Sequence, residues 1–243
     1  MRRRVAMRLA STSNHLVYTD GERWLKKPRN SGATAHAEIA RDIVVNRALG
    51  RAVEALDDTM ILEHLGEPVP ADEFHISDAA KHLQSLHQTP INETDLLSVD
   101  EWRADVEEKV EERLADHPGT RAWAHKVFAS VGPPPATTSG GLAISDPHSM
   151  NWVRHRSGTL HPLDFETTCW ADQVMSLACL VHYAVVEEKP IPIEVHVEVR
   201  RTGRWFFTMK AVAAVAWLAR NRNTPEDLPA RIRRMEASPY WGA

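Results

Sequence analysis

Cysteine is scarce in this sequence, with only Cys169 and Cys179 among 243 residues. Two cysteines are too few for a disulfide framework, and their wide spacing matches no zinc motif. We interpret both as buried thiols of a reducing compartment, and we therefore expect a cytoplasmic protein. Histidine is more abundant, but His82 and His87 lie five positions apart rather than the four that share a helical face, so no histidine metal site is predicted.

Long apolar runs are also missing. None follows the basic start Met1–Arg4, so we expect neither a signal peptide nor a membrane span. The formal net charge of −4 argues against a nucleic-acid partner held mainly through phosphate contacts. Hydrophobic residues make up 43% of the chain and charged residues 26%, which is typical of a globular protein. The 243 residues are enough for one large domain or two small lobes.

Short strand and helix patterns predict a small β-rich lobe over residues 1–66. The dipeptide Asp20-Gly21 favours a tight turn between two of the strands. Apolar residues at near-helical spacing follow, and a further short apolar strand comes after them. We expect strands over Val5–Leu9, His15–Thr19, Arg23–Lys27 and Thr59–Leu62, with a helix over Ala35–Leu49.

Residues 67–243 predict a larger, mainly helical lobe with one β interruption. Ser77 can cap a helix, and Ser98 with Glu101 has the spacing of a capping box at the start of the acidic stretch Asp100–Asp116. Thr224-Pro225 suits the start of a last helix. The expected strands are Leu142–Ile144, Asn151–Val153 and Leu160–Leu163, and the expected helices are Val174–Val186 and Arg204–Arg220. The aromatic residues predicted to lie in the core are Trp205, Phe206, Phe207 and Trp217.

Three polar residues in the β interruption suit phosphoryl transfer. Asp146 and Asn151 share one loop and Asp164 lies in another, each at the edge of a short apolar strand. Phosphoryl transfer needs a carboxylate that orients and deprotonates the acceptor hydroxyl, and oxygen ligands that hold magnesium against the nucleotide phosphates. Asp and Asn are common in turns, so the agreement with the surrounding elements supports this interpretation more than any single residue does.

The spacing of these residues resembles that of the aminoglycoside phosphotransferase and choline kinase-like family, relatives of the protein kinases. That family typically carries His-Gly-Asp, an Asn five residues after the Asp, and an Asp-Phe or Asp-Leu pair after a short hairpin. The match here is Asp146, Asn151 and Asp164-Phe165. The resemblance implies an α+β, protein-kinase-like fold of two lobes, with Asp146 as catalytic base and Asn151 and Asp164 as magnesium ligands.

The resemblance extends, more weakly, over nearly the whole chain. Strand Arg23–Lys27 looks like the strand whose lysine grips the nucleotide phosphates, which implies this role for Lys26, with Lys27 as the fallback. The acid that pairs with this lysine is left open. Asp42 best fits the distance to the helix end, while Glu38 lies one turn earlier on the same face and has the more usual side chain.

Further nucleotide contacts follow from the same resemblance. Ser13 and Asn14 sit where relatives have the loop that covers the phosphates. Met60–Leu65 resembles the strand and hinge whose backbone contacts adenine, so Glu63 and Leu65 are candidates for that contact. The implied cofactors are ATP, or GTP, and Mg²⁺.

Two departures from the family pattern leave a second function open. The usual His-Gly before the catalytic Asp is Ile144-Ser145 here, and a downstream Asp is replaced by Ser176. These positions help brace the catalytic loop in kinase-like folds, so the change is either a paired replacement or a sign of weakened catalysis. The alternative function is that of a pseudokinase, a nucleotide- or partner-binding module without turnover.

The expected acceptor is a hydroxyl on a small molecule, with an aminoglycoside-like antibiotic or amino sugar as the leading class. The acidic residues between positions 100 and 116 could attract such a cationic substrate. The alternative for this stretch is a solvated helix face, partly offset by Arg103, Lys109 and Arg113. The oligomeric state is left open.

Overall fold

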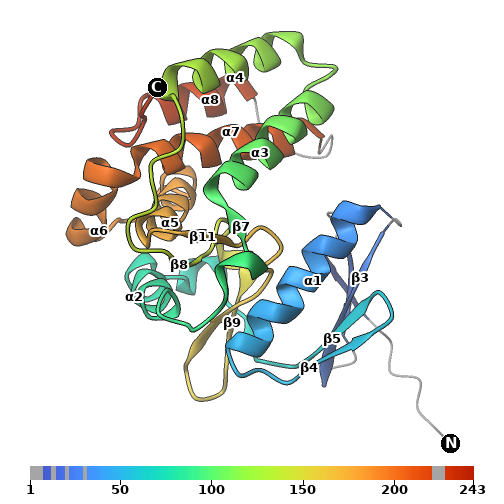
Figure 1. The fold of residues 1–243 in the computed structure, drawn as a ribbon. Helices are drawn as coiled ribbons and strands as arrows, with labels where there is room; N and C mark the ends of the chain where they lie inside the picture. Colours follow the sequence, from blue (N-terminus) through green and yellow to red (C-terminus); the bar gives the residue numbers. More distant parts are fainter. Residues whose placement is uncertain (1–7, 12–14, 20–21, 30–31, 221–227) are drawn as a thin grey trace, which may run out of the picture.

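The computed structural model describes residues 8–11, 15–19, 22–29, 32–220 and 228–243. They form two lobes, which Figure 1 shows as a small sheet with helix α1 at the lower right and a mainly helical part at the upper left. The α+β, two-lobed architecture expected from the sequence is therefore confirmed. The boundary at residue 66 stays a prediction.

The small lobe is built on a five-stranded antiparallel sheet with the order β1-β2-β3-β5-β4. The register places Lys26 of β3 opposite Val17 of β2 and Met60 of β5, away from the edges of the sheet. The sequence pattern does not predict β4, because most of its side chains are exposed and lack a buried alternate face. The bounds are β1 Arg8–Ser11, β2 His15–Thr19, β3 Arg23–Pro28, β4 Val53–Leu56 and β5 Thr59–Glu63.

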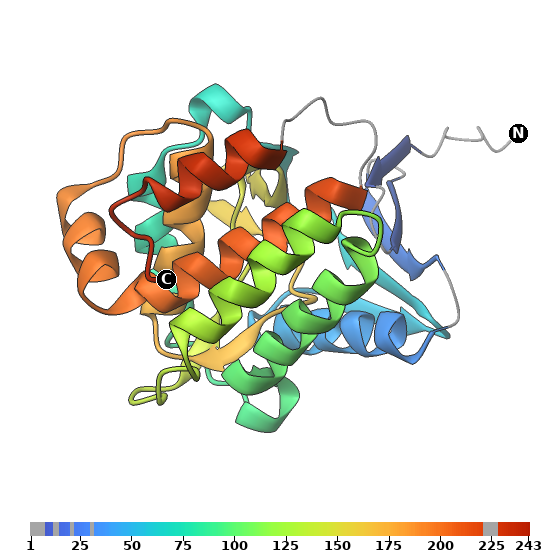
Figure 2. The same ribbon diagram turned by 90° about the horizontal axis from the view of Figure 1, so that it is seen from above.

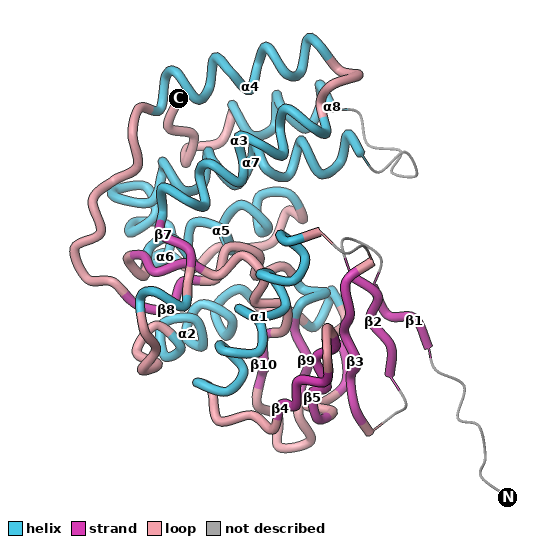
Figure 3. Tube along the Cα trace, turned by 45° about the vertical axis from the view of Figure 1, so that its right-hand side comes forward, coloured by secondary structure: helices cyan, strands magenta, loops and turns pink. Residues whose placement is uncertain are grey.

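Helix α1, Ala33–Ala48, lies across one face of this sheet (Figures 1 and 3). Ile39 of α1 packs into a small core with Met60 and Leu62 of β5. The inward positions, three or four residues apart, are Ala35, Glu38, Ile39, Asp42, Val45 and Asn46. Two carboxylates thus lie on the buried face of the helix, and they need partners because an unpaired buried charge is costly.

Gly66 lies where the chain passes from the sheet to the larger lobe. Its φ is +152°, and a Cβ at this position would lie 2.3 Å from the carbonyl oxygen of Arg154. Only glycine allows so close an approach of two backbone segments. The next residues form β6, Glu67–Pro68, which pairs with a strand of the larger lobe.

The larger lobe carries two small sheets, with the orders β10-β9-β6 and β7-β11-β8. The strand bounds are β7 Leu97–Ser98, β8 Gly141–Ala143, β9 Trp152–Arg154, β10 Leu160–Pro162 and β11 Cys169–Ala171. The helix bounds are α2 Ile76–Leu86, α3 Val99–Arg113, α4 Pro118–Val131, α5 Val174–Val186, α6 Ile193–Glu198, α7 Arg204–Arg220 and α8 Leu228–Glu236. Nearly all of α5 is buried, and α7 packs against α3, α5 and α8 (Figure 2). Among the described residues, no helix is long and apolar enough to cross a membrane.

The helix predictions of the larger lobe are confirmed for α5 and α7, which have the expected bounds. The capping box is also present, since Ser98 and Glu101 exchange hydrogen bonds at the start of α3. Ser77 is not a cap, however. Helix α2 begins one residue earlier, at Ile76, so Ser77 lies inside its first turn.

The aromatic residues of α7 divide between core and surface. Phe206 and Phe207 are buried as predicted, whereas Trp217 is 41% exposed, so its predicted place in the core is wrong. Trp217 belongs to the less buried stripe of α7, two turns beyond Lys210. The predicted turn at Asp20-Gly21 and helix start at Thr224-Pro225 lie outside the described residues.

Candidate active site

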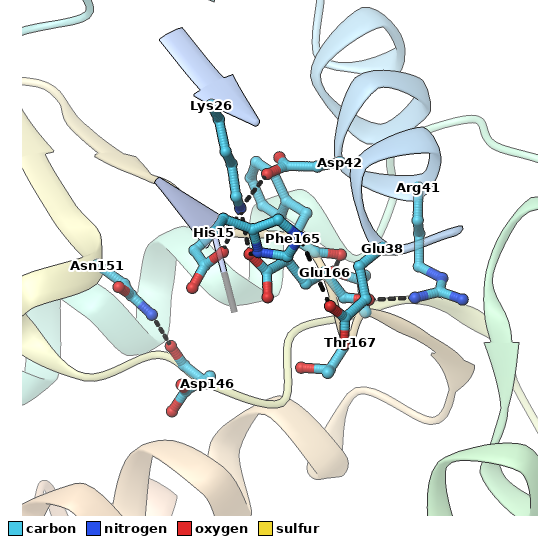
Figure 4. Close-up of polar contacts among 12 residues, drawn as sticks. His15, Lys26, Glu38, Arg41, Asp42, Asp146, Asn151, Phe165, Glu166 and Thr167 are labelled. Carbon is cyan, nitrogen blue, oxygen red and sulfur yellow. Dashed lines mark hydrogen bonds and ion pairs between the residues drawn. The ribbon is translucent and has the colours of Figure 1, made fainter. Parts of the chain in front are cut away.

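Lys26 of β3 is the charged centre of the candidate site. Its side chain is 7% exposed, and Nζ lies 2.7 Å from Oδ2 of Asp42 on α1. The same nitrogen lies 2.6 Å from Oδ1 of Asp164 and 2.5 Å from Oε1 of Glu166. Figure 4 shows Lys26 with Asp42 and Glu166 around it. Burial alone would lower the pKa of Lys26, but the three carboxylates, Asp164 first, raise it well above its usual value. The charged ammonium therefore joins the small lobe to the segment after β10.

Of the two acids that the sequence left open, Asp42 is the one that pairs with Lys26. Asp42 is 1% exposed, and its Oδ1 also accepts a hydrogen bond of 2.8 Å from Asn46. Glu38 lies one turn earlier and points elsewhere, with Nε2 of His15 at 3.6 Å and Nζ of Lys109 at 3.9 Å. Burial, followed by the negative charge of Glu166, raises the pKa of Glu38.

Asp164 lies in surroundings that hold more negative than positive groups. Its partial burial, followed by the charge of Glu166, raises its pKa to about 7 against the opposing effect of Lys26. Its φ of +65° lies in the left-handed region, where a residue other than glycine is held only by its surroundings. The neighbouring Phe165 is fully buried, and the guanidinium of Arg51 lies 5.3 Å from the centre of its ring. These contacts hold the Asp164 backbone in place.

Glu166 and His15 are members of the site that sequence reasoning missed. Nδ1 of His15 lies 2.5 Å from Oε1 of Glu166, and Nε2 lies 3.3 Å from the carbonyl oxygen of Ala35. Burial alone would lower the pKa of His15, but the hydrogen bond and charge of Glu166 outweigh it and raise the pKa. Arg41 donates to the Glu166 backbone oxygen. The only local signal for Glu166 is its place two residues after Asp164.

His15, Glu38 and Glu166 are residue types that bind metal ions, and they lie close together. Both ring nitrogens of His15 lie near oxygen atoms, with Nδ1 at 2.5 Å from Oε1 of Glu166 and Nε2 at 3.3 Å from the carbonyl oxygen of Ala35. We interpret this cluster as a set of polar contacts that connects β2, α1 and the segment after β10.

Asp146 and Asn151 lie together in the loop between β8 and β9, opposite Lys26 in Figure 4. Nδ2 of Asn151 donates to the backbone oxygen of Asp146 at 3.0 Å, and its amide oxygen takes no part in this bond. The backbone oxygen of Asn151 accepts from Leu163 at 2.7 Å, so this loop is tied to the residue before Asp164. The structure thus brings the predicted metal ligands to one region of the site.

The Asp146 carboxylate lies between two basic side chains. Nζ of Lys210, on α7, lies 2.6 Å from Oδ1, and Nε2 of His148 lies 3.5 Å from Oδ2. Partial burial alone would raise the pKa of Asp146, but Lys210 and then His148 hold it well below its usual range. Asp146 is therefore ionised, and Lys210 is a further site residue that the sequence pattern does not mark.

The residues that depart from the family pattern bond to their surroundings. The buried backbone N–H of Ile144 donates to Oγ of Ser176 at 2.9 Å. Oγ of Ser145 donates to the backbone oxygen of Thr167 at 2.8 Å and lies 2.6 Å from its Oγ1. Ser176 thus supports the loop from α5, and Ser145 ties it to the segment after Asp164.

The remaining predicted nucleotide contacts are placed only in part. Ser13 and Asn14 lie outside the described residues. Glu63 is the last residue of β5, and its Oε1 accepts a hydrogen bond of 3.3 Å from the backbone of Ala52. Leu65 is 7% exposed and packs in the small-lobe core. The adenine contacts of Glu63 and Leu65 therefore stay predictions.

The acidic helix α3 has partners for most of its carboxylates. Asp105 pairs with Lys109 at 2.7 Å on the same helix. Four further acids of α3 also have partners. The pairs are Glu101 with Ser98, Glu107 with Arg103, Glu111 with His125, and Glu112 with Arg220. These pairs favour a solvated, internally balanced helix face over an open negative patch.

Comparison with known proteins identifies the fold. No family model and no curated protein matches this sequence. A choline/ethanolamine kinase family protein from Mesorhizobium loti matches in structure at 15% identity, covering 96% of this chain and 89% of that one, with a TM-score of 0.55. Choline kinase LicA from Streptococcus pneumoniae matches at 12% identity over 93% and 91%, with a TM-score of 0.58. Amicoumacin kinase hAmiN in complex with AMP-PNP, Ca²⁺ and Ami matches at 13% identity over 97% and 89%, with a TM-score of 0.59.

These proteins share the architecture that the resemblance implied. The likeness covers nearly the full length of this chain and most of each neighbour. The protein-kinase-like α+β fold is therefore confirmed, while the low identities leave reaction and substrate to be argued from the site itself.

Replacing Ser176 with Ala removes the acceptor of the buried Ile144 N–H. We expect the free energy of unfolding in urea to fall by about 1–3 kcal/mol, the cost of an unpaired buried donor. The control is Ser130→Ala on α4, whose hydroxyl donates to the Val127 carbonyl in its own helix. It should change stability by less than about 0.5 kcal/mol. Equal losses in the two variants would show that Ser176 does not support the loop.

Proposed function

We propose that this protein transfers the γ-phosphoryl group of ATP, or GTP, to a hydroxyl group of a small molecule. The observation that carries the proposal is the pairing of one buried ammonium, Lys26, with three carboxylates. On the opposite side of the same site, Asp146 and Asn151 form the second half of the arrangement that phosphoryl transfer needs.

The charges around Lys26 fit a site for Mg²⁺. One ammonium faces the carboxylates of Asp42, Asp164 and Glu166. Even with a protonated His15 beside Glu166, this cluster holds fewer positive groups than carboxylates. Oxygen ligands are the kind that Mg²⁺ prefers, and Asn151 and Asp164 would supply them. When bound, the ion would supply positive charge against the phosphate oxygens.

Lys26 would hold the nucleotide phosphates in this reaction. Its ammonium has three donors, and Asp42 can keep one of them while the others turn from Asp164 and Glu166 to phosphate oxygens. Asp42 is buried on a helix that packs against the sheet, so it fixes the direction of the lysine. His15 would remain as the positive partner of Glu166 when Lys26 turns away.

Asp146 would accept a hydrogen bond from the acceptor hydroxyl and orient its oxygen toward the phosphorus. Phosphoryl transfer passes through a loose transition state, so positioning and charge contribute more than proton removal. The strong ionisation of Asp146 suits this role, because its carboxylate stays available as an acceptor at physiological pH. The proton would pass to Asp146 late in the transfer.

The second candidate is a pseudokinase, a nucleotide- or partner-binding module without turnover. Ile144 and Ser145, which stand where relatives have His-Gly, favour it. The bonds of Ile144 to Ser176 and of Ser145 to Thr167 support turnover instead, because they hold the catalytic loop in place. We therefore rank the active kinase first.

The proposed acceptor class follows from the likeness to the structural neighbours. The structural neighbours are kinases of choline, ethanolamine, aminoglycosides and amicoumacin. A cationic acceptor, such as an aminoglycoside-like antibiotic or amino sugar, is proposed on this likeness alone, because the acids of α3 have partners of their own. We also propose a cytoplasmic location, since Cys169 and Cys179 are both buried and free.

Asp164→Ala tests the proposed metal site. Without this carboxylate, Mg²⁺ should no longer raise the affinity for ATP, as measured by calorimetric titration with and without the ion. Asp116→Ala, at an exposed position after α3, is the control and should keep the full magnesium effect. If folded Asp164→Ala protein keeps the wild-type magnesium dependence, Asp164 is not a ligand.

Asp146→Asn separates binding from chemistry. The amide keeps the shape of the side chain but loses the negative charge that orients the acceptor hydroxyl and the capacity to take its proton, so kcat should fall by about 10²–10⁴-fold. ATP affinity should stay near that of the wild type. The measurement is ADP formation with magnesium-ATP and a library of small hydroxyl compounds. Full activity in this variant would remove Asp146 from the mechanism, and loss of ATP binding by folded protein would assign it to the metal instead.

A further inference from the structure

Lys210 reaches the catalytic loop from a distant part of the larger lobe. It lies on α7, 64 positions along the chain from Asp146, and its Nζ donates to Oδ1 of Asp146 at 2.6 Å. Only 17% of its side chain is exposed, whereas lysine on the outer stripe of a helix is ordinarily solvated. Lys210 thus contacts Oδ1 of Asp146, the residue proposed to orient the acceptor hydroxyl.

Helix α7 gives Lys210 a rigid base. Met209 and Ala211, its neighbours in the sequence, are fully buried, and α7 packs along both α3 and α5. A lysine stem of this kind lies along apolar surface while the ammonium reaches a polar partner. The position of the ammonium is thus set by the core of the lobe and not by the loop it contacts.

The two oxygens of Asp146 differ in what surrounds them. Oδ1 has the short contact with Lys210, whereas Oδ2 faces Nε2 of His148 only at 3.5 Å. That distance is long for a hydrogen bond, so Oδ2 keeps capacity to accept one from another group. Asn151 holds the backbone oxygen of the same residue at 3.0 Å. The carboxylate is thus fixed on one side and available on the other.

We propose that Lys210 is a positioning residue for phosphoryl transfer, which holds Oδ1 of Asp146 so that Oδ2 faces the acceptor hydroxyl. This inference rests on the proposed function, since it assigns a role within that reaction. A contribution to folding stability does not explain the pair of Lys210 and Asp146, because buried ion pairs often stabilise a protein no more than apolar residues of similar volume. Orientation is a better explanation, because a displacement of about 1 Å in a reacting geometry costs on the order of 10²-fold in rate.

The test compares Lys210→Met, Lys210→Arg and Lys126→Met with the wild type. Methionine keeps an unbranched apolar stem without the charge, arginine keeps the charge, and Lys126 is an exposed lysine of α4. ADP formation is measured with magnesium-ATP and a library of small hydroxyl compounds. We expect Lys210→Met to lower kcat on the order of 10²-fold with KM for ATP unchanged, because the loss acts on orientation and not on nucleotide binding. Lys210→Arg should recover most of kcat, and Lys126→Met should match the wild type.

Each other outcome decides against a specific statement. An unchanged kcat in Lys210→Met overturns this inference and leaves the proposed function intact. A loss that Lys210→Arg does not recover, or one accompanied by a higher KM for ATP, also overturns it, because packing and not charge would then explain the effect. Absence of ADP formation by the wild type with every compound contradicts the proposed function, and the role of Lys210 is then rejected as well. If Lys210→Met does not fold, Lys210→Gln takes its place.

Discussion

One buried ammonium among three carboxylates is the interaction on which the arrangement of this molecule depends. Lys26 and Asp42 come from the sheet and helix of the small lobe, whereas Asp164 and Glu166 follow β10. Each carboxylate would be costly to bury alone, so the four groups hold one another in place and join the two lobes. The same imbalance of charge that joins the lobes also creates the place for a divalent cation. The charges around Lys26 thus account both for the contact between the lobes and for the proposed cation site.

The opposite side of the site depends on contacts from outside the loop between β8 and β9, which carries Asp146 and Asn151. Loops have few backbone bonds of their own, so side chains from packed elements must fix them. Ser176 on α5 bonds to the backbone of Ile144, and Lys210 on α7 bonds to the carboxylate of Asp146. Both helices belong to the well-packed part of the larger lobe. A conformation set by that core is therefore transmitted to the group that would orient the acceptor.

Sequence reasoning predicted the parts of this candidate site that leave a local pattern. Asp146, Asn151 and Asp164 follow one another at fixed spacing in the chain, and α5 and α7 show as long apolar helices with clear ends. It could not choose between Glu38 and Asp42, because both lie on the inward face of α1 and only the packed structure shows which one reaches the lysine.

The sequence does not mark His15, Glu166 or Lys210 as site residues, because contacts between distant segments bring them there. Lys210, for example, lies 64 positions along the chain from Asp146. No local spacing in the sequence indicates contacts of this kind.

The most direct test of the account is a crystal structure of the protein with Mn²⁺, as a stand-in for Mg²⁺, and a non-hydrolysable ATP analogue, with the metal located by its anomalous signal. The account predicts that the metal is bound by the side-chain oxygens of Asn151 and Asp164. It also predicts that Nζ of Lys26 contacts nucleotide phosphates while it keeps its bond to Asp42. A metal and nucleotide bound elsewhere, or a Lys26 that keeps all three carboxylates in the complex, would contradict it.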